Sequence, residues 1–499
     1  MRPNILLVTA DQWRGDWLGA CGVPVSTPAV DALAAEGTLF ARHYAPCAPC
    51  SPARASLYTG LYQMNHRVVW NGAGLDARFD TLALAARRAG YLPTLFGYTD
   101  TAPDPRRLAP ADPARATFEG VLPGFHLRQG LDEAERPWIS WLRARGHTVP
   151  EPARRHAVPP EPGERISRRP PLYGAGETQT AFLTEAFLTW LGEQEAGRPW
   201  FAHLSFLRPH PPFAVPEPFA SMYAEDALPP PVRAESPAAE AVQHPFVAAI
   251  QDQQLLSDFI PEGSGRARDL SPRDFARLRA LYAGMISEVD AQIGRIAAAL
   301  RAAGQWQDTV VIFTSDHGEM LGDHWMLGKG GFFEESYHIP LILRVPGQAG
   351  GERVEAFTSA VDIFPTLAEL MGVAPGHAVD GASLLPFTAG TPPARWREAA
   401  LWEFDFRLLP ATRGADHGLA PEDCVLQCRR DARHLYAASP ALPPALYDLA
   451  EDPGCLRNRA GDPAMQGARL AAAEALLADR ARLMDRTLAD RAVWDWPAG

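Results

Sequence analysis

Three side chains that could bind a metal ion stand at the ends of apolar runs. The run "NILLVTA" at 4–10 is followed by Asp11, and "DTVVIFTS" at 308–315 is followed by Asp316 and His317. Short apolar runs are typical of buried parallel strands, whose carboxyl ends meet at one edge of a sheet. Two carboxylates and an imidazole there would bind one divalent cation, with Mn²⁺ or Zn²⁺ favoured and Ca²⁺ or Mg²⁺ possible. The alternative is that each Asp only caps the turn or helix that follows.

A second candidate for chemistry is the cysteine pair in "CAPC", Cys47 and Cys50. Two cysteines at this spacing are found in redox motifs and in zinc sites. Prolines on both sides of the second cysteine are atypical of the redox motif, which normally opens a helix directly. A zinc site would need further ligands, for which Cys424 and Cys428 are the candidates.

The longer stretch "CSPARASLYTG" at 50–60 resembles the signature of the sulfatase family, Cys-x-Pro-x-Arg followed by a short helix. In that family the cysteine is oxidised to formylglycine by a formylglycine-generating enzyme. The resemblance implies that Cys50 is the precursor of a hydrated aldehyde. One hydroxyl of the hydrate attacks sulfur or phosphorus, and the other lets the ester collapse. Pro52 and Arg54 would be recognised during this modification, and Arg54 would also be a charge partner of formylglycine.

The resemblance extends over nearly the whole chain. It includes "PNILLVTADQ" at 3–12, "SDHGEMLGDH" at 315–324 and "ALYDLAEDPGCLRNRA" at 445–460. It implies an alkaline-phosphatase-like fold and a single metal ion. The ligands of that ion would be Asp11, Cys50 as formylglycine, Asp316 and His317.

Departures from the common sulfatase pattern point to one branch of the family. Most sulfatases have a second acid at the position of Gln12, an Asn at that of His317, and a Gly-Lys-x-His loop where this chain has "FGYTDT" at 96–101. These changes, with "LYTGLYQMNHRVVWNG" at 57–72 and "LRPHPPF" at 207–213, are similar to the phosphonate monoester hydrolase and arylsulfatase branch. Members of that branch also cleave phosphodiesters and aryl sulfates.

This resemblance implies substrate-binding residues. Asn71 would hydrogen-bond an oxygen of the transferred group, and Tyr98 with Thr99 or Asp100 would line the pocket. The branch usually has threonine near position 100, so the acid there argues against a preference for doubly charged substrates.

The same resemblance implies that His210 and Lys329 neutralise the ester oxygens and protonate the leaving group. Without it, a His between prolines would be a loop residue and a Lys beside glycines a solvated one. Gln12 and His324 are candidates for supporting the residues that bind metal and substrate.

Alternating helical and strand patterns predict how these residues are positioned. Apolar spacing of three and four residues predicts helices, and the apolar runs that follow them predict strands. Such alternation indicates a large, mostly parallel sheet sandwiched by helices. The predicted helix and strand pairs are 78–90 with 91–97, 178–194 with 199–207, and 275–304 with 308–316, and a further helix at 27–37 follows the first strand.

Near residue 385 the alternating helix and strand patterns give way to patterns typical of short antiparallel strands. This change predicts two domains. We expect a catalytic α/β domain at 1–385, with long rim loops near 101–175 and 208–270 that are rich in Pro, Arg and Gly. Residues 386–499 are expected to form a smaller antiparallel sheet and a terminal helix from about 462 to 487.

Composition limits the classes of partner. The 499 residues are 46% hydrophobic and carry a formal net charge of −12, which disfavours nucleic acid and anionic membranes. We expect a cytoplasmic protein because the start of the sequence has no leader pattern. Six cysteines are too few for a disulfide framework. Relatives of the branch imply a homo-oligomer, either a tetramer or a dimer.

The sequence therefore predicts a formylglycine- and metal-dependent hydrolase of phosphonate monoesters, phosphodiesters and sulfate esters, with a small anionic ester as its substrate. One alternative is a dedicated sulfatase acting on aryl or choline-like sulfates. Another is a Cys-x-x-Cys protein with a redox or zinc-binding function.

Overall fold

The computed structural model describes residues 2–132, 134–149, 156, 160, 163–195, 197–261, 263–408 and 419–485. Within these residues, eight strands form one large sheet in the order β5-β4-β6-β1-β7-β8-β2-β9. Their bounds are β1 Asn4–Ala10, β2 Thr38–Tyr44, β4 Pro93–Gly97, β5 His126–Gly130, β6 Phe201–Phe206, β7 Thr309–Thr314, β8 Leu341–Arg344 and β9 Glu352–Ser359.

The large sheet is mostly parallel. β1 lies at its centre and pairs in parallel with β6 on one side and with β7 on the other. β8 runs antiparallel to both β7 and β2. All seven residues of β1 are buried, as expected for a strand with neighbours on both edges and helices on both faces. The predicted fold class is confirmed.

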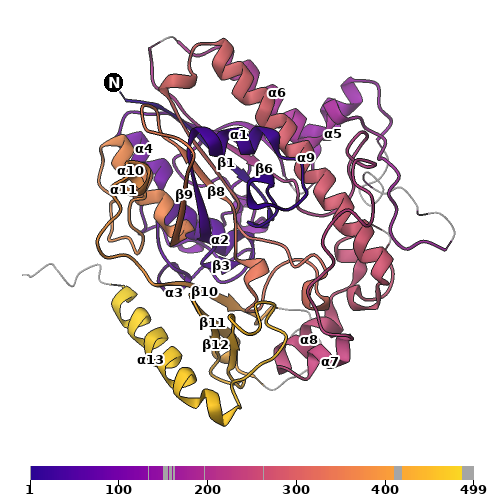
Figure 1. Ribbon diagram of the computed structural model, residues 1–499. Coiled ribbons are helices and arrows are strands. Elements are labelled where there is room, and N and C mark those ends of the chain that lie inside the picture. Colours follow the sequence, from indigo (N-terminus) through magenta and orange to yellow (C-terminus); the bar gives the residue numbers. More distant parts are fainter. Residues whose placement is uncertain are drawn as a thin grey trace, which may run out of the picture.

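Helices cover both faces of this sheet because side chains alternate along each strand. Ile5 and Leu7 join a core with α2 (Cys50–Thr59), α4 (Leu82–Arg88) and α10 (Ile363–Met371). Leu6 and Val8 join a second core with α1 (Pro28–Glu36), α5 (Arg136–Ala144), α6 (Gln179–Gly192) and α9 (Pro272–Ala302). In Figure 1, α4 and α10 lie to the left of the strands, and α5, α6 and α9 lie to their right. Each aliphatic side chain that is fully buried in these cores stabilises the folded state by about 1.5–3 kcal/mol, compared with the same side chain exposed to water.

Local sequence explains where the longest helix begins. Ser271 is the N-cap of α9, its hydroxyl accepts a hydrogen bond from the amide of Asp274, and the Asp274 carboxylate bonds back to Ser271. Pro272 occupies the first helical position, where its missing N–H costs nothing. Across the described ranges, no helix combines the length and the apolar character that a membrane crossing needs.

The two segments expected as rim loops contain regular structure. β5 and α5 lie within 101–175, and α7 (Pro237–Ala241) and α8 (Pro245–Gln253) lie within 208–270. β5 is an edge strand of sequence "HLRQG" with three exposed residues. It lacks the apolar run of a central strand, so the pattern in the sequence could not reveal it. Two further short α-helices are α3 (Gln63–His66) and α11 (Leu385–Thr388).

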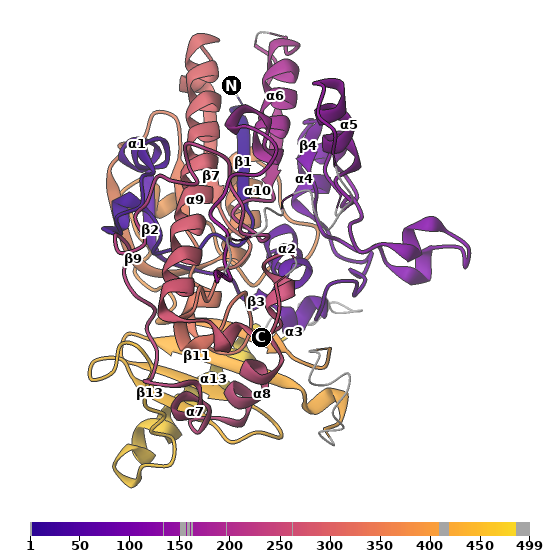
Figure 2. The same cartoon turned by 90° about the vertical axis from the view of Figure 1, so that its right-hand side faces the viewer.

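A second sheet has the order β13-β12-β11-β10-β3. The strands β10 (Ala399–Asp405), β11 (Val425–Asp431), β12 (His434–Ala438) and β13 (Ala445–Asp448) are antiparallel, and α13 (Gln466–Leu483) packs on them. β3 (Cys47–Ala48) adds to β10 in parallel. Figure 2 shows this sheet and α13 below the large sheet. Because β3 directly precedes α2, the small sheet is joined to the segment that carries Cys50.

Candidate active site

Four neighbouring strands bring candidate side chains to one edge of the large sheet. β1 ends before Asp11, β7 ends shortly before Asp316 and His317, and β4 ends before Tyr98. β6 leads into the loop that carries His210. Since β4, β6, β1 and β7 are adjacent and parallel, their carboxyl ends meet. The pairing of the strands therefore gathers residues that lie hundreds of positions apart in the chain.

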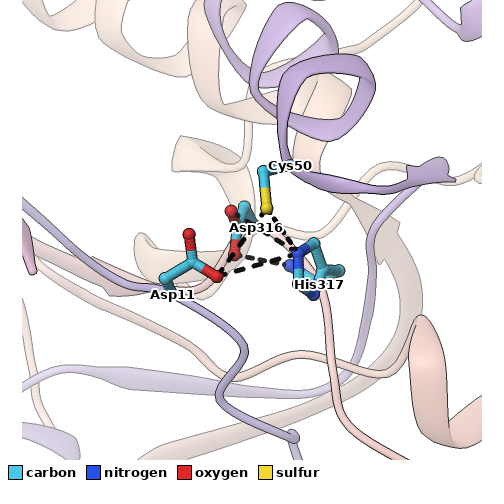
Figure 3. Close-up of side chains that lie close together, drawn as sticks. All are labelled: Asp11, Cys50, Asp316 and His317. Atoms are coloured by element: carbon cyan, nitrogen blue, oxygen red, sulfur yellow. Dashed lines mark hydrogen bonds and ion pairs between the residues drawn. The ribbon is translucent and has the colours of Figure 1, made fainter. Parts of the chain in front are cut away.

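Cys50 reaches this edge from the first residue of α2. Its side chain is 4% exposed, and its Sγ lies 3.2 Å from Nε2 of His317 and 4.0 Å from Oδ1 of Asp11. Figure 3 shows the side chain pointing from the helix into the space between Asp11, Asp316 and His317.

These four side chains lie close enough together to hold one metal ion, and we call them the ligand set. One ligand atom each of Asp11, Cys50, Asp316 and His317 lies within 4.8 Å of the other three. His317 Nδ1 donates a hydrogen bond to the carbonyl of Gly318 at 3.1 Å, so its Nε2 carries a lone pair toward the other ligands. Two carboxylates, a neutral imidazole and the residue at position 50 are a donor set that fits a single divalent cation. Such a group occurs nowhere else among the described residues.

Arg54, one turn after Cys50 on α2, links both carboxylates. Its Nε lies 2.9 Å from Oδ2 of Asp316, and its Nη2 lies 3.0 Å from Oδ2 of Asp11. Nη1 donates to Oγ of Ser205 at 2.8 Å, and Tyr98 donates its hydroxyl to Asp11 at 2.7 Å. Arg54 is 1% exposed, so its buried positive charge must be stabilised by these partners rather than by water.

The surroundings shift the pKa values of the ligand side chains. Burial would raise the pKa of Asp11, but His210, Arg54, His317 and Lys329 outweigh it and lower that pKa. Burial lowers the pKa of His317, which favours the neutral ligand form. Burial, with the charge of Asp11, raises the pKa of the Cys50 thiol well above its usual value. Reactive redox thiols have lowered pKa values, so this environment is unlike theirs.

Lys329 and His210 lie together beside the ligand set. Lys329 Nζ donates to Oε1 of Gln12 at 2.7 Å and to Nε2 of His210 at 3.1 Å. Burial and the charge of Lys329 lower the pKa of His210 to about 3, so His210 is a neutral acceptor. Lys329 stands between Gly328 and Gly330, whose φ angles of 71° and 126° favour glycine. The glycines on either side of Lys329 are therefore explained by the backbone conformation of this loop, which other residues rarely adopt.

Asn71 and Asp100 also lie near this edge. Asn71 Oδ1 accepts a hydrogen bond of 2.9 Å from the amide of Ser51, the residue after Cys50. Asp100 is 6% exposed, and its Oδ2 lies 3.8 Å from Nε of Arg54. Burial and the nearby Asp11 raise the pKa of Asp100 to about 8, although Arg54 opposes the shift.

Two other candidates make their contacts elsewhere. The Thr99 hydroxyl donates to the carbonyl of Gly120 at 2.6 Å and accepts from the amide of Leu122 at 2.9 Å, so it anchors the 120–122 segment. His324 Nδ1 pairs with Glu240 at 2.7 Å, and its ring stacks on Phe333 with centroids 3.5 Å apart. Neither side chain bonds to the ligand set.

Sequence reasoning assigned no role to Ser205 or Glu319, although both contact candidate residues. Ser205 bonds to Arg54, and Glu319 accepts a hydrogen bond from Gln12. A lone serine in the apolar run "FAHLSF" gave no usable signal. Glu319 lies within the "SDHGE" stretch, whose spacing from Asp316 could have indicated it.

The alternative of a redox or structural zinc site receives no support. All six cysteines are free thiols. Cys47 Sγ lies 3.5 Å from the hydroxyl of Ser56, and Cys424 and Cys428 belong to the small-sheet region. None of these three cysteines is part of a metal-ligand group among the residues that the structure describes.

Comparisons with known proteins agree with this geometry. The sulfatase family model matches residues 3–373, and a model of the C-terminal part of N-sulphoglucosamine sulphohydrolase matches residues 322–481. A multifunctional alkaline phosphatase superfamily protein from Trinickia caryophylli is 39% identical over 98% of this chain and 97% of its own length.

Two solved structures have the same architecture throughout. A phosphonate monoester hydrolase of Agrobacterium radiobacter superposes with a TM-score of 0.95 at 55% identity, covering 99% of this chain and 98% of its own. A phosphonate monoester hydrolase from Silicibacter pomeroyi superposes with a TM-score of 0.92 at 39% identity, covering 98% and 97%. The chain belongs to the sulfatase family of ester hydrolases, within the alkaline phosphatase superfamily.

Proposed function

We propose that this chain is a formylglycine- and metal-dependent hydrolase of phosphonate monoesters, phosphodiesters and sulfate esters. The observation that carries the proposal is the position of Cys50, which lies within the ligand set and beside Arg54. The 55% identity to a phosphonate monoester hydrolase supports the choice of substrate class.

The ligand set defines where a metal ion and formylglycine would act. Asp11, Asp316, His317 and a formylglycine made from Cys50 would hold the ion, with Mn²⁺ or Zn²⁺ favoured by the imidazole. When bound, the ion polarises an oxygen of the phosphoryl or sulfuryl group, and the formylglycine hydrate supplies a nucleophilic hydroxyl. The modification requires a formylglycine-generating enzyme as a partner during maturation.

The remaining residues bind the ester and handle protons. Two of the three N–H groups of Lys329 donate to Gln12 and His210, so the third can donate to a non-bridging oxygen of the substrate. Lys329 can transfer an ammonium proton to the departing alkoxide and become a neutral amine, which its hydrogen bond with His210 Nε2 holds in place. Asn71, fixed through the amide of Ser51, adds a hydrogen bond to the transferred group.

We expect Lys329→Ala to lower kcat/KM by about 10²–10³-fold, because it removes charge stabilisation and a proton donor together. The loss should be larger for an alkyl leaving group than for p-nitrophenol, which departs without protonation. His210→Ala should show the same dependence on the leaving group. Equal losses for both classes of substrate would contradict a role in leaving-group departure.

A dependence on pH is expected from Asp100. Its carboxyl becomes ionised as the pH rises through about 8, which places a negative charge beside Arg54 and repels an anionic ester. We expect kcat/KM to fall by about tenfold above that pH. Asp100→Asn should remove this fall and leave activity below pH 7 nearly unchanged. An identical pH profile for the variant would contradict the assignment.

A substrate panel tests the proposed function. Protein produced with a formylglycine-generating enzyme is first checked by the mass of the peptide that contains Cys50. A phosphonate monoester and an aryl sulfate with the same phenol are then compared. We expect turnover of both, with the phosphonate monoester preferred. A hundredfold preference for the sulfate would instead identify a dedicated sulfatase acting on aryl or choline-like sulfates.

The same proposal includes cytoplasmic location, assembly as a homo-oligomer and a division at about residue 385 into catalytic and C-terminal parts. The parallel pairing of β3 with β10 means that the two parts share a sheet. Separation at residue 385 would therefore disturb the strand that precedes Cys50.

A further inference from the structure

A cavity of about 630 Å³ lies beside the first turns of α9, and none of its lining residues belongs to the candidate active site. A volume of this order suits a small organic molecule. One wall consists of three consecutive prolines, Pro229 to Pro231, and the lining also includes Arg233 and Arg279. Prolines have no N–H group, so that wall offers a ligand no backbone hydrogen-bond donor. The two arginines supply the positive charge of the cavity.

Arg233 has a stacked guanidinium whose hydrogen-bond donors are not used. Its central carbon lies 3.7 Å from the ring centroid of Trp325 and 4.3 Å from that of Phe275. It makes no hydrogen bond or ion pair to any residue that the structure describes, and its Nη1 is buried without an acceptor. Stacking attracts the positive charge to the ring faces, but it uses none of the N–H groups, which lie in the guanidinium plane. An oxyanion would supply the missing acceptors.

Arg279 lines the same cavity and also lacks an acceptor. It is 4% exposed, and its Nη1 donates to the carbonyl of Leu321 at 3.0 Å and to Oδ1 of Asp323 at 3.3 Å. Its Nε is buried and has no hydrogen-bond partner among the described residues. Asp323 does not belong to Arg279 alone, because the same carboxylate also pairs with Arg14. A buried charged donor left in this way calls for a bound ligand or ion.

The pKa values of the two arginines show that their positive charge is not balanced. Burial lowers the pKa of Arg233, and the charge of Arg279 lowers it further, although Asp323 opposes the shift. Burial also lowers the pKa of Arg279, again against Asp323. At Arg14, by contrast, Asp16 and Asp323 outweigh burial and raise the pKa. An anion in the cavity would supply the negative charge that Arg233 and Arg279 lack.

The acidic residues of the cavity do not supply that charge. Glu225 accepts hydrogen bonds from Arg273 at 3.0 Å and from Arg277 at 2.7 Å, so its charge is already paired. Asp226 and Glu235 are exposed, where water and salt screen their charges. The buried arginines are therefore left to a ligand.

We propose that this cavity is a binding site for a small organic phosphonate or phosphate, whose anionic group is bound by Arg233 and Arg279. Two unbalanced cations suit a phosphoryl group, which carries a charge of about −1.5 to −2 at pH 7. A planar guanidinium can donate to two oxygens of such a group at once. Leu228 and Pro231 would contact the organic part of the ligand. The site lies outside the ligand set and does not depend on the proposed function.

Crystals of the wild-type protein soaked in 4-bromophenylphosphonate test the proposal, because bromine can be located by anomalous diffraction. We expect a bromine peak in the cavity, with phosphonate oxygens within hydrogen-bond distance of Arg233 and Arg279. 4-Bromobenzyl alcohol, a neutral probe of similar size, should give no peak there. Bromine only at the ligand set, or a peak in the cavity with the neutral probe, would overturn the proposal.

Titration calorimetry with two variants measures the contribution of the guanidinium. Arg233→Met keeps an unbranched side chain between Trp325 and Phe275 but removes the charge and the donors. At up to about 1 mM 4-bromophenylphosphonate, we expect wild-type protein to bind one more equivalent per chain than Arg233→Met, since losing charged hydrogen bonds weakens binding by about tenfold or more.

Arg273→Met is the matched control for the calorimetry. Its side chain is 69% exposed and pairs with Glu225 at the same cavity, so the variant removes a nearby arginine that is not proposed to bind the ligand. It should bind as many equivalents as wild type. Equal stoichiometry in wild type and Arg233→Met, or loss of one equivalent in both variants, would overturn the proposal.

Discussion

Replacing Cys50 by alanine should lower kcat/KM for both phosphonate monoesters and aryl sulfates by roughly 10⁴–10⁶-fold, a loss typical of removing a nucleophile. The side chain at position 50 is proposed to be both the attacking group and a ligand of the ion. It lies 3.2 Å from Nε2 of His317, so alanine leaves a gap in the ligand set. The measurement is steady-state kcat/KM on both substrates, with metal content determined on the same samples.

Cys50→Ser is the informative companion to the alanine variant. Serine keeps an oxygen in the ligand set, but it lacks the second hydroxyl through which the ester of the hydrate collapses. We expect at most one turnover per chain, visible as a burst of phenol. The phosphonate or sulfate group that stays bound to the serine would then be released very slowly. Sustained turnover by Cys50→Ala within about tenfold of wild type would contradict the nucleophilic role of this position.

Asp316→Asn should cause the second large loss, about 10³-fold or more in kcat/KM, with loss of bound metal from the isolated protein. Asp316 is 1% exposed, and its carboxylate both belongs to the ligand set and pairs with Arg54 at 2.9 Å. Asparagine removes the negative charge that both the metal ion and the Arg54 guanidinium require. Asp11→Asn should behave in the same way, because Asp11 pairs with Arg54 at 3.0 Å.

Metal analysis distinguishes this loss from misfolding. Wild-type protein should carry one ion per chain, lose activity on dialysis against a chelator and regain it with Mn²⁺ or Zn²⁺. Asp290→Asn serves as a control: it removes a buried carboxylate that accepts hydrogen bonds from the amides of Ala29 and Val30 at the start of α1, and the variant should keep its ion. Full metal content together with wild-type activity in Asp316→Asn would show that Asp316 is not a ligand.

The positions of Asp11 and Asp316 were predictable because they follow apolar runs. A run of that length becomes a central strand, and parallel neighbours end at the same edge, so β1 and β7 place both acids together. The residue at position 50 could be added only through its resemblance to a family, since no periodicity brings α2 to that edge.

Other contacts could not be predicted because they depend on tertiary packing. Tyr98 and Thr99 are adjacent in the sequence, yet Tyr98 bonds to Asp11 whereas Thr99 bonds to Gly120. Successive side chains point in different directions at the end of a strand, and the sequence does not show which one faces the site. β3 comprises only Cys47 and Ala48, too short for any pattern, although it joins the small sheet to the segment before Cys50.

The central claim is that the residue at position 50 shares one metal ion with Asp11, Asp316 and His317. Anomalous diffraction at the absorption edge of the bound metal, from crystals of formylglycine-containing protein, tests it most directly. We predict a single strong peak within bonding distance of an oxygen at position 50, both carboxylates and His317 Nε2. A peak elsewhere, or one that the side chain at position 50 does not contact, would contradict the account.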